Sequence, residues 1–378
     1  MKKFTIKNFF LNKKKFSITT EVVISNTFLK NLEINKNILY IKNRNINNFL
    51  DKSIKRKFGK IIKKIIVKPP GEPSSKMINK YLNKSYISKI DQILVVGGGS
   101  AIDFAKGISV IKPKNRIEYH EFKNRIKKCL PIISIPTTCG TGSDISPYCV
   151  INNSDTKRKF TIKDEKFIPI KTCIYPNILS SIDRKFIFSS LFDAFSHCLE
   201  IFLNKNQKFE LKKLAFAGIK LGVRLLEEKI SKKNYINYML LSFYGGICLA
   251  KSRTSIIHTC SVAYAKYINL PHGLLNLFLT ANGINFNSKF IKKEISLIER
   301  HLKEKNLYKW LEKIEKNNKR YMSYSPKKIK SNKILQRIKQ DKTLKLVCHS
   351  ITSDKNLKNL IMEINEKIKK KNLKKNLR

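Results

Sequence analysis

Residues 91–111 read DQILVVGGGSAIDFAKGISVI, and this stretch decides the fold of the N-terminal half. It opens with Asp91 to Val96 (DQILVV), whose continuous apolar run ILVV is typical of a buried parallel strand. Three glycines and Ser100 follow, and Ala101 to Ile111 then has the pattern of a helix. A glycine turn between a strand and a helix suits a phosphate group, because glycine lets the backbone approach a ligand and the helix presents free N–H groups. A plain tight turn fits equally well, since Ile102 stands where GxGxxG requires its third glycine.

Strand and helix patterns alternate on both sides of this stretch. We predict strands over 37–42 and 131–136 and a helix over 74–83, whereas at 60–68 the strand and helix patterns compete. Strands that alternate with helices favour an α/β domain built on a parallel sheet.

The pattern changes after about residue 180, where strand signals nearly vanish. The helices predicted there cover 189–203, 209–230, 235–250, 274–280 and 292–306. We therefore expect a dinucleotide-binding α/β domain over 1–180 and an all-α, metal-binding domain over 181–378. The last residues, 367–378, form a basic run that we interpret as a solvated, fraying tail.

The net charge is extreme, because 78 Lys and Arg against 27 Asp and Glu give +51. Such a charge allows binding to nucleic acid or an anionic membrane. The basic residues are spread through the whole chain, however, and Lys, Ile, Asn and Phe are all abundant, which favours compositional drift. We expect no specific nucleic-acid partner. We also expect no membrane span, since no run of about 18 apolar residues exists.

A second polar loop, PTTCGTGSD at 136–144, follows the predicted strand at 131–136. Its hydroxyls and glycine amides would lie at the C-terminal end of a parallel strand, where ligands of open α/β sheets bind. The alternative is a loop whose hydroxyls only cap the next helix.

Asp193 and His197 lie four residues apart in the predicted helix over 189–203, so they share one helix face. A carboxylate and an imidazole on an apolar helix need partners, because unpaired burial is costly. They either pair with each other or share a metal. His258 and His272 complete an Asp/His₃ set that suits Fe²⁺ or Zn²⁺ with one position open for substrate.

Four segments together resemble the signatures of the iron-containing alcohol dehydrogenase family, in the family's order. They are GGGSAIDFAK at 97–106, IPTTCGTGSD at 135–144, DAFSHCLE at 193–200 and HTCSVAYAKYINLPHG at 258–273. The resemblance implies a Rossmann-like N-terminal domain, a helical C-terminal domain, and hydride transfer between NAD or NADP and an alcohol or aldehyde.

The resemblance also assigns roles to single residues. The four metal ligands would be Asp193, His197, His258 and His272. The cofactor would meet Gly98, Gly99, Ser100 and Asp103 at its pyrophosphate, Thr137, Thr138 and Thr141 along its length, and Asn43 and Lys159 near its riboses. No catalytic residue beyond the metal ligands is implied, because a further histidine of many members is replaced by Val262.

Asn43 also stands where the family usually has an aspartate, and Arg44 follows it. We therefore expect NADP to be accepted at least as well as NAD. Eight scattered cysteines without a CxxC pair indicate a reducing compartment, so we expect a cytoplasmic protein, and we expect a homodimer. Two other functions stay open at this point: a metal-dependent, non-redox cyclase similar to dehydroquinate synthase, and a basic nucleic-acid-binding protein.

Overall fold

The computed structural model divides into two compact units by the contacts within the chain. One comprises residues 1–183 and 231–250, and the other comprises 184–230 and 251–378. The structure describes the chain except for residues 1–15, 17, 28, 30, 31, 33, 35, 36, 45, 47, 59, 60, 68–70, 83, 111–125, 127, 157, 158, 351, 377 and 378.

The first unit is built on a six-stranded sheet in which every neighbouring pair is parallel, in the order β1-β8-β5-β4-β2-β3. This confirms the predicted α/β class with a parallel sheet. The strands are β1 (Glu21–Ile24), β2 (Ile38–Asn43), β3 (Ile61–Val67), β4 (Gln92–Gly97), β5 (Ile132–Pro136) and β8 (Lys171–Ile174).

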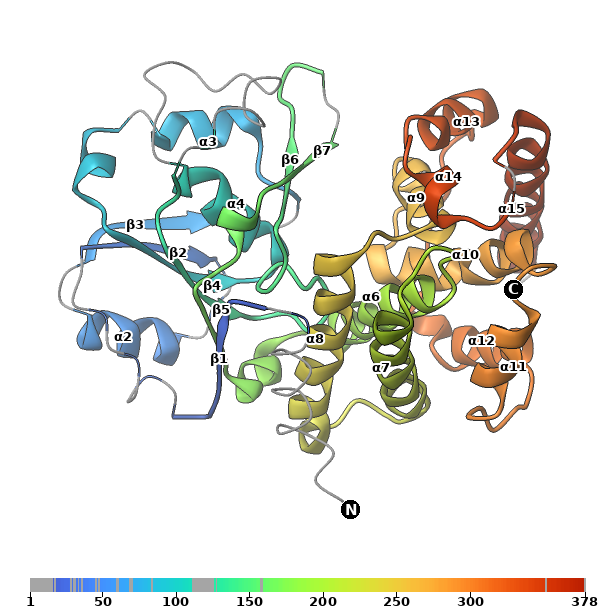
Figure 1. The fold of residues 1–378 in the computed structure, drawn as a ribbon, viewed down its shortest axis with the longest axis horizontal. Helices are drawn as coiled ribbons and strands as arrows, with labels where there is room; N and C mark the ends of the chain where they lie inside the picture. Colours follow the sequence, from blue (N-terminus) through green and yellow to red (C-terminus); the bar gives the residue numbers. More distant parts are fainter. Residues whose placement is uncertain are drawn as a thin grey trace. The chain divides into compact units, whose positions relative to one another are not determined.

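The two central strands β4 and β5 are buried at every residue, as their continuous apolar sequences predict. Within the ambiguous stretch at 60–68, residues 61–67 form the edge strand β3. Helices cover both faces of the sheet, with α3 (Ser75–Leu82) and α4 (Gly99–Ser109) on one side and α2 (Asn48–Lys57) on the other (Figure 1).

An antiparallel hairpin, β6 (Tyr148–Asn152) and β7 (Lys159–Lys163), follows the polar loop at 136–144 and was not predicted. Helix α8 (Tyr235–Lys251) also belongs mostly to this unit, although the sequence pattern groups it with the helical half. Its Gly246 meets the polar loop through the backbone, because a Cβ on Gly246 would lie 3.0 Å from the Cα of Gly142.

The second unit is helical, and it has no strand in the residues that the structure describes. Its helices are α6 (Arg184–Phe202), α7 (Phe209–Glu227), α9 (Ile256–Tyr264), α10 (His272–Asn287), α11 (Lys292–Glu299), α12 (Leu307–Asn317), α13 (Ser331–Lys339), α14 (Leu344–Val347) and α15 (Asp354–Asn376). The stretch 292–306, predicted as one helix, is helical only to Glu299. Lys305 has a φ of 50°, and the Asn306 side chain caps α12 by accepting from the backbone N–H of Lys309.

The basic run at the C-terminus differs from its prediction. Helix α15 continues through Asn376, so residues 367–376 are helical and not a fraying tail. Lys367 and Lys371 both form ion pairs with Glu315, and both ammonium groups lie over the ring of Phe278. Among the described residues, no helix has the length and apolar character to cross a membrane.

Candidate metal centre and dinucleotide-binding turn

Helix α6 carries the first two predicted ligands, one turn apart. Its apolar side chains bury it along most of its length, and Asp193 and His197 are themselves only 6% and 5% exposed. The Oδ1 atom of Asp193 lies 3.7 Å from Nε2 of His197. Two polar side chains are thus buried among apolar ones. Burying a charge without a partner is unfavourable, so both side chains need partners.

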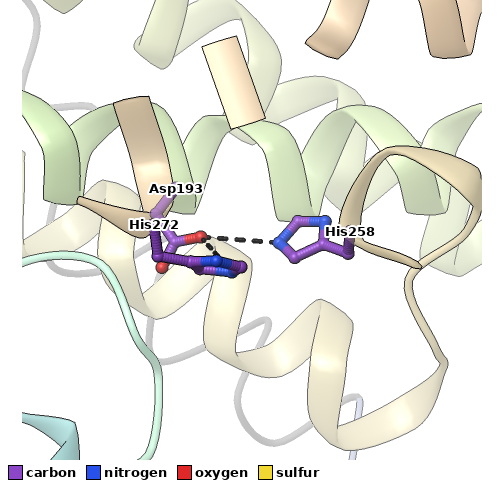
Figure 2. Close-up of side chains that lie close together, drawn as sticks. All are labelled: Asp193, His258 and His272. Carbon is purple, nitrogen blue, oxygen red and sulfur yellow. Dashed lines mark ion pairs between the residues drawn. The ribbon is translucent and has the colours of Figure 1, made fainter. Parts of the chain in front are cut away.

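The structure brings His258 and His272 to the same place. His258 lies in the first turn of α9 and His272 begins α10, and their Nε2 atoms are 3.4 and 3.6 Å from Asp193 Oδ1. Figure 2 shows the Asp193 carboxylate with both imidazole rings directed at it. The His197 ring stacks on that of His258, with 4.7 Å between centroids.

Three of the four predicted ligands form a group that could hold one ion: Asp193, His258 and His272 each offer one ligand atom, and these atoms lie within 4.8 Å of one another. His197 lies outside this group, although its Nε2 atom is 3.7 Å from Asp193 Oδ1. Ligand bonds of about 2.1 Å in a tetrahedron place neighbouring donor atoms about 3.4 Å apart. The three imidazole nitrogens lie 3.4–3.7 Å from the same carboxylate oxygen. One carboxylate oxygen with three imidazole nitrogens is a donor set for Fe²⁺ or Zn²⁺. His272 is 46% exposed, so the centre is reached from solvent on its side.

The metal-free centre has strongly displaced pKa values. Burial lowers the pKa of His197 to about 3, and the neighbouring His258 and His272 add to this effect against the attraction of Asp193. Burial alone would lower the pKa of His258, but Glu200 and Asp193 raise it to about 9. Burial alone would raise the pKa of Asp193, but the three histidines hold it far below its ordinary value. Asp193 therefore stays ionised, and the centre favours a positive charge on His258 but disfavours one on His197.

Three further residues surround the predicted ligands, and the sequence reasoning missed them. Glu200 contacts His258 Nδ1, the Ser261 hydroxyl lies 3.2 Å from His272 Nδ1, and the Asn276 amide donates to Asp193 Oδ1 at 3.0 Å. Sequence spacing could have indicated Glu200, because positions 193, 197 and 200 lie on one face of a helix.

The glycine turn and the polar loop lie together at the C-terminal ends of β4 and β5. A Cβ on Gly98 would lie 2.9 Å from Thr138, and one on Gly99 would lie 3.0 Å from Thr141. A Cβ on Gly97 would lie 3.0 Å from Oδ1 of Asn43, at the end of β2. The turn thus has no room for larger residues, and it gathers three predicted cofactor-binding regions at the edge of the sheet where ligands bind.

The other predicted cofactor residues are placed differently. Asp103 is buried, and its carboxylate accepts from the Ser143 hydroxyl at 2.5 Å and from the Val150 N–H at 3.1 Å. It joins α4 to the polar loop and to β6, so its two oxygens are engaged within the protein. Burial raises the pKa of Asp103 to about 6. Lys159 forms an ion pair with Glu72, and the N–H of Thr137 donates to the carbonyl of Gly97 at 3.0 Å.

Two family models match most of the chain. Residues 24–176 match the model described as iron-containing alcohol dehydrogenase, and residues 187–371 match the C-terminal model of the same family.

Curated relatives match about half of the chain. A 4-hydroxybutyrate dehydrogenase of Clostridium kluyveri is 27% identical over 217 residues, which are 56% of this chain and 58% of that protein. A 1,3-propanediol dehydrogenase of Klebsiella pneumoniae is 24% identical, over 52% of each chain. An NAD-dependent methanol dehydrogenase of Bacillus methanolicus is 24% identical, over 56% of this chain and 57% of that protein. The matches thus span less than two thirds of these relatives.

Solved structures share the fold over nearly the whole chain. An iron-containing alcohol dehydrogenase has a TM-score of 0.78 at 20% identity and covers 92% of this chain and 97% of its own. One from Thermococcus thioreducens has a TM-score of 0.77 at 19% identity, covering 92% and 98%.

Proposed function

Because this chain belongs to the iron-containing alcohol dehydrogenase family, we propose that it transfers hydride between NAD(P) and a small primary alcohol or its aldehyde. The observation that carries the proposal is the set of three histidine nitrogens within 3.4–3.7 Å of one oxygen of Asp193. Paired side chains in a helical core do not require three such neighbours, whereas a bound divalent ion does.

In this proposal Asp193, His197, His258 and His272 hold Fe²⁺ or Zn²⁺. When bound, the metal supplies Lewis acidity to the substrate oxygen and the nicotinamide supplies the hydride chemistry. The protein holds the three imidazoles around Asp193 and excludes water from three of the four ligands. The exposed side at His272 admits the substrate. Val262, one turn after His258, has no proton to give, so the proton of the alcohol leaves by another route.

The nucleotide in this proposal lies over the glycine turn. The free N–H groups at the start of α4 favour a pyrophosphate at Gly98, Gly99 and Ser100. Thr138 and Thr141 flank the turn, and Asn43 lies beside Gly97. Asp103 then acts through the loop that it anchors, and Lys159 reaches the nucleotide only by leaving Glu72.

The proposed substrate class rests on the relatives, whose names refer to 4-hydroxybutyrate, 1,3-propanediol and methanol. All three are short molecules with a primary hydroxyl group. We infer a substrate of this class. We also infer a homodimer and a cytoplasmic location, and the eight free cysteines suit the reducing compartment of the second inference. Contact with duplex DNA should be sequence-blind and should fade steeply with salt.

The test is a screen of the purified protein, loaded with Fe²⁺ or Zn²⁺, against short primary alcohols with NAD⁺ and NADP⁺. The expected result is metal-dependent formation of NAD(P)H, followed by its absorbance. A nucleotide that binds but is never reduced by any alcohol, or oxidised by any aldehyde, would favour the non-redox cyclase instead.

A further inference from the structure

Glu200 is the most deeply buried acidic residue at the centre, with 2% of its surface exposed. It lies on α6, seven residues after Asp193, and both of its oxygens face α9. Oε1 accepts from the backbone N–H of Ile257 at 2.7 Å, and Oε2 is in hydrogen-bond contact with Nδ1 of His258. A buried carboxylate is thus satisfied by two donors from the helix that carries a predicted metal ligand.

This pairing decides which nitrogen of His258 carries the proton, and Nε2 can then accept from the Asn276 amide, whose nitrogen lies 3.1 Å away. A carboxylate only accepts hydrogen bonds, so the proton that it shares belongs to Nδ1. The lone pair of the neutral ring is then on Nε2, the atom 3.4 Å from Asp193 Oδ1. Histidines that bind metals usually donate their other ring nitrogen to such a partner, which fixes the tautomer and the ring orientation.

The other two imidazoles are held differently. Nδ1 of His272 lies 3.2 Å from the neutral hydroxyl of Ser261. Nδ1 of His197 is buried and has no hydrogen-bond partner in the part of the chain that the structure describes. A carboxylate is a stronger acceptor than a hydroxyl, because hydrogen bonds to charged groups are about twice as strong. His258 is therefore the best-oriented donor of the set.

We propose that Glu200 is a positioning residue that sets the metal affinity of the centre by holding His258 in its metal-binding tautomer. This inference rests on the proposed metal centre and adds a residue to which no ligand role is assigned. The competing explanation is structural: Glu200 would only satisfy an N–H in the first turn of α9, where helix donors lack intrahelical partners.

The variant Glu200→Gln separates the two explanations. Glutamine keeps the size of the side chain but has one accepting oxygen, whereas Glu200 accepts two bonds on two oxygens. If the amide oxygen keeps the hydrogen bond from the Ile257 N–H, the amide nitrogen faces His258 Nδ1. Because this nitrogen is a donor, Nδ1 must accept and the ring proton moves to Nε2. If the oxygen turns to His258, the Ile257 N–H loses its acceptor.

The experiment measures the dissociation constant of Zn²⁺ for the metal-free protein by competition with a chelator, together with unfolding of the metal-free protein in urea. For Glu200→Gln we expect Zn²⁺ binding to weaken by about 10–100-fold. Glu200→Asp, which keeps the charge, should recover part of this loss. Ser261→Ala, which removes the neutral partner of His272, is the matched control and should weaken binding less.

Unchanged Zn²⁺ affinity in Glu200→Gln, with lower stability of the metal-free protein, would overturn the proposal and leave the helix-capping role. A loss in Ser261→Ala equal to that in Glu200→Gln would also overturn it. Failure of the proposed function is distinct, because the wild-type protein would then bind no Zn²⁺ tightly. If Glu200→Gln does not fold, Glu200→Asp must still bind Zn²⁺ more weakly than wild type for the proposal to stand.

Discussion

The backbone of Ser189 on α6 touches Gly273 on α10 so closely that a β-carbon on Gly273 would lie 1.8 Å from the Ser189 carbonyl oxygen. The same β-carbon would lie 3.0 Å from the backbone nitrogen of Asp193. Gly273 follows His272 directly, and Asp193 lies one turn beyond Ser189. The glycine contact therefore sets the distance between two of the proposed metal ligands.

Replacing Gly273 with alanine should disturb both stability and metal binding. The added methyl group meets backbone that cannot turn aside, so α6 and α10 must separate. We expect a loss of about 3 kcal/mol in the free energy of unfolding, at the upper end for overpacked sites. Zn²⁺ affinity should fall as well, because His272 moves with its helix. Urea unfolding and chelator competition measure the two effects.

Gly283→Ala is the matched control in the same helix. Its β-carbon would lie 2.5 Å from Cγ1 of Ile257, a side chain that has more freedom to shift. It should cost less stability than Gly273→Ala. Equal losses in both variants, or normal Zn²⁺ affinity in Gly273→Ala, would contradict this account of the contact.

The sequence predicts the central strands and the class of the sheet better than it predicts the short strands and the long-range contacts. The central strands β4 and β5 could be predicted because each is mostly apolar, and the sheet class follows from the alternation of strands with helices. Strands β1 and β8 have four residues each, too few to show a period. The prediction of a fraying C-terminal tail was wrong. Glu315, which pairs with Lys367 and Lys371, lies more than fifty residues before them in the sequence, so no local pattern indicates these contacts.

The same limit applies to the site. Asp193 and His197 could be predicted to lie together, because a helix places positions i and i+4 on one face. The hydrogen bonds that other residues make to these ligands could not be predicted. Glu200 meets His258 from 58 residues away and Asn276 meets Asp193 from 83, and no local period encodes such pairs. Asp103 is a different case. It lies inside a predicted cofactor signature, but its carboxylate accepts hydrogen bonds from Ser143 and Val150 of the same protein, which the sequence pattern does not indicate.

The end of β2 should decide between NAD and NADP. Asn43 lies beside Gly97 and carries no charge to repel a 2′-phosphate, and Arg44 is exposed directly after it. We expect Asn43→Asp to lower kcat/KM for NADP⁺ by about tenfold through repulsion, and Arg44→Ala to lower it by a similar factor through a lost charge-assisted bond. Steady-state kinetics with both nucleotides measure the ratio. A strong NAD⁺ preference in wild type that Arg44→Ala leaves unchanged would refute this expectation.

Asp51 on α2 should make stability depend on pH in the acid range. Its Oδ2 atom pairs with the buried Lys42 at 2.9 Å and with Lys64 at 3.1 Å. Burial alone would raise the pKa of Asp51, but hydrogen bonds from these lysines lower it from 3.8 to about 2. Because the folded pKa lies below the unfolded one, the stabilisation is complete above about pH 4 and is lost as the pH falls through 2.

Asp51→Asn tests this directly, because it leaves the Lys42 ammonium group buried without its carboxylate. We expect it to cost roughly 3 kcal/mol of unfolding free energy at pH 6. The difference from wild type should narrow between pH 4 and pH 2.5, where Asp51 takes up its proton in the unfolded chain but stays ionised in the folded protein. Urea unfolding at these pH values measures it, and a difference that is constant with pH would contradict the ion-pair explanation.

The decisive prediction concerns two proposed metal ligands, His272 and His258. Replacing either should abolish activity, but only the replacement of His258 should also lower stability. His272 is half-exposed, so His272→Ala should abolish alcohol-dependent reduction of the nucleotide and weaken Zn²⁺ binding while leaving stability and nucleotide binding close to wild type. His258→Ala should abolish the same activity and also destabilise the metal-free protein by about 1–3 kcal/mol, because it leaves the buried Glu200 without its imidazole partner.

His301→Ala, in the same unit but outside the centre, is the control and should keep full activity. A chelator should inactivate the wild-type protein, and Fe²⁺ or Zn²⁺ should restore it. Full turnover in metal-free protein, or in His272→Ala, would refute the metal-dependent dehydrogenase proposal.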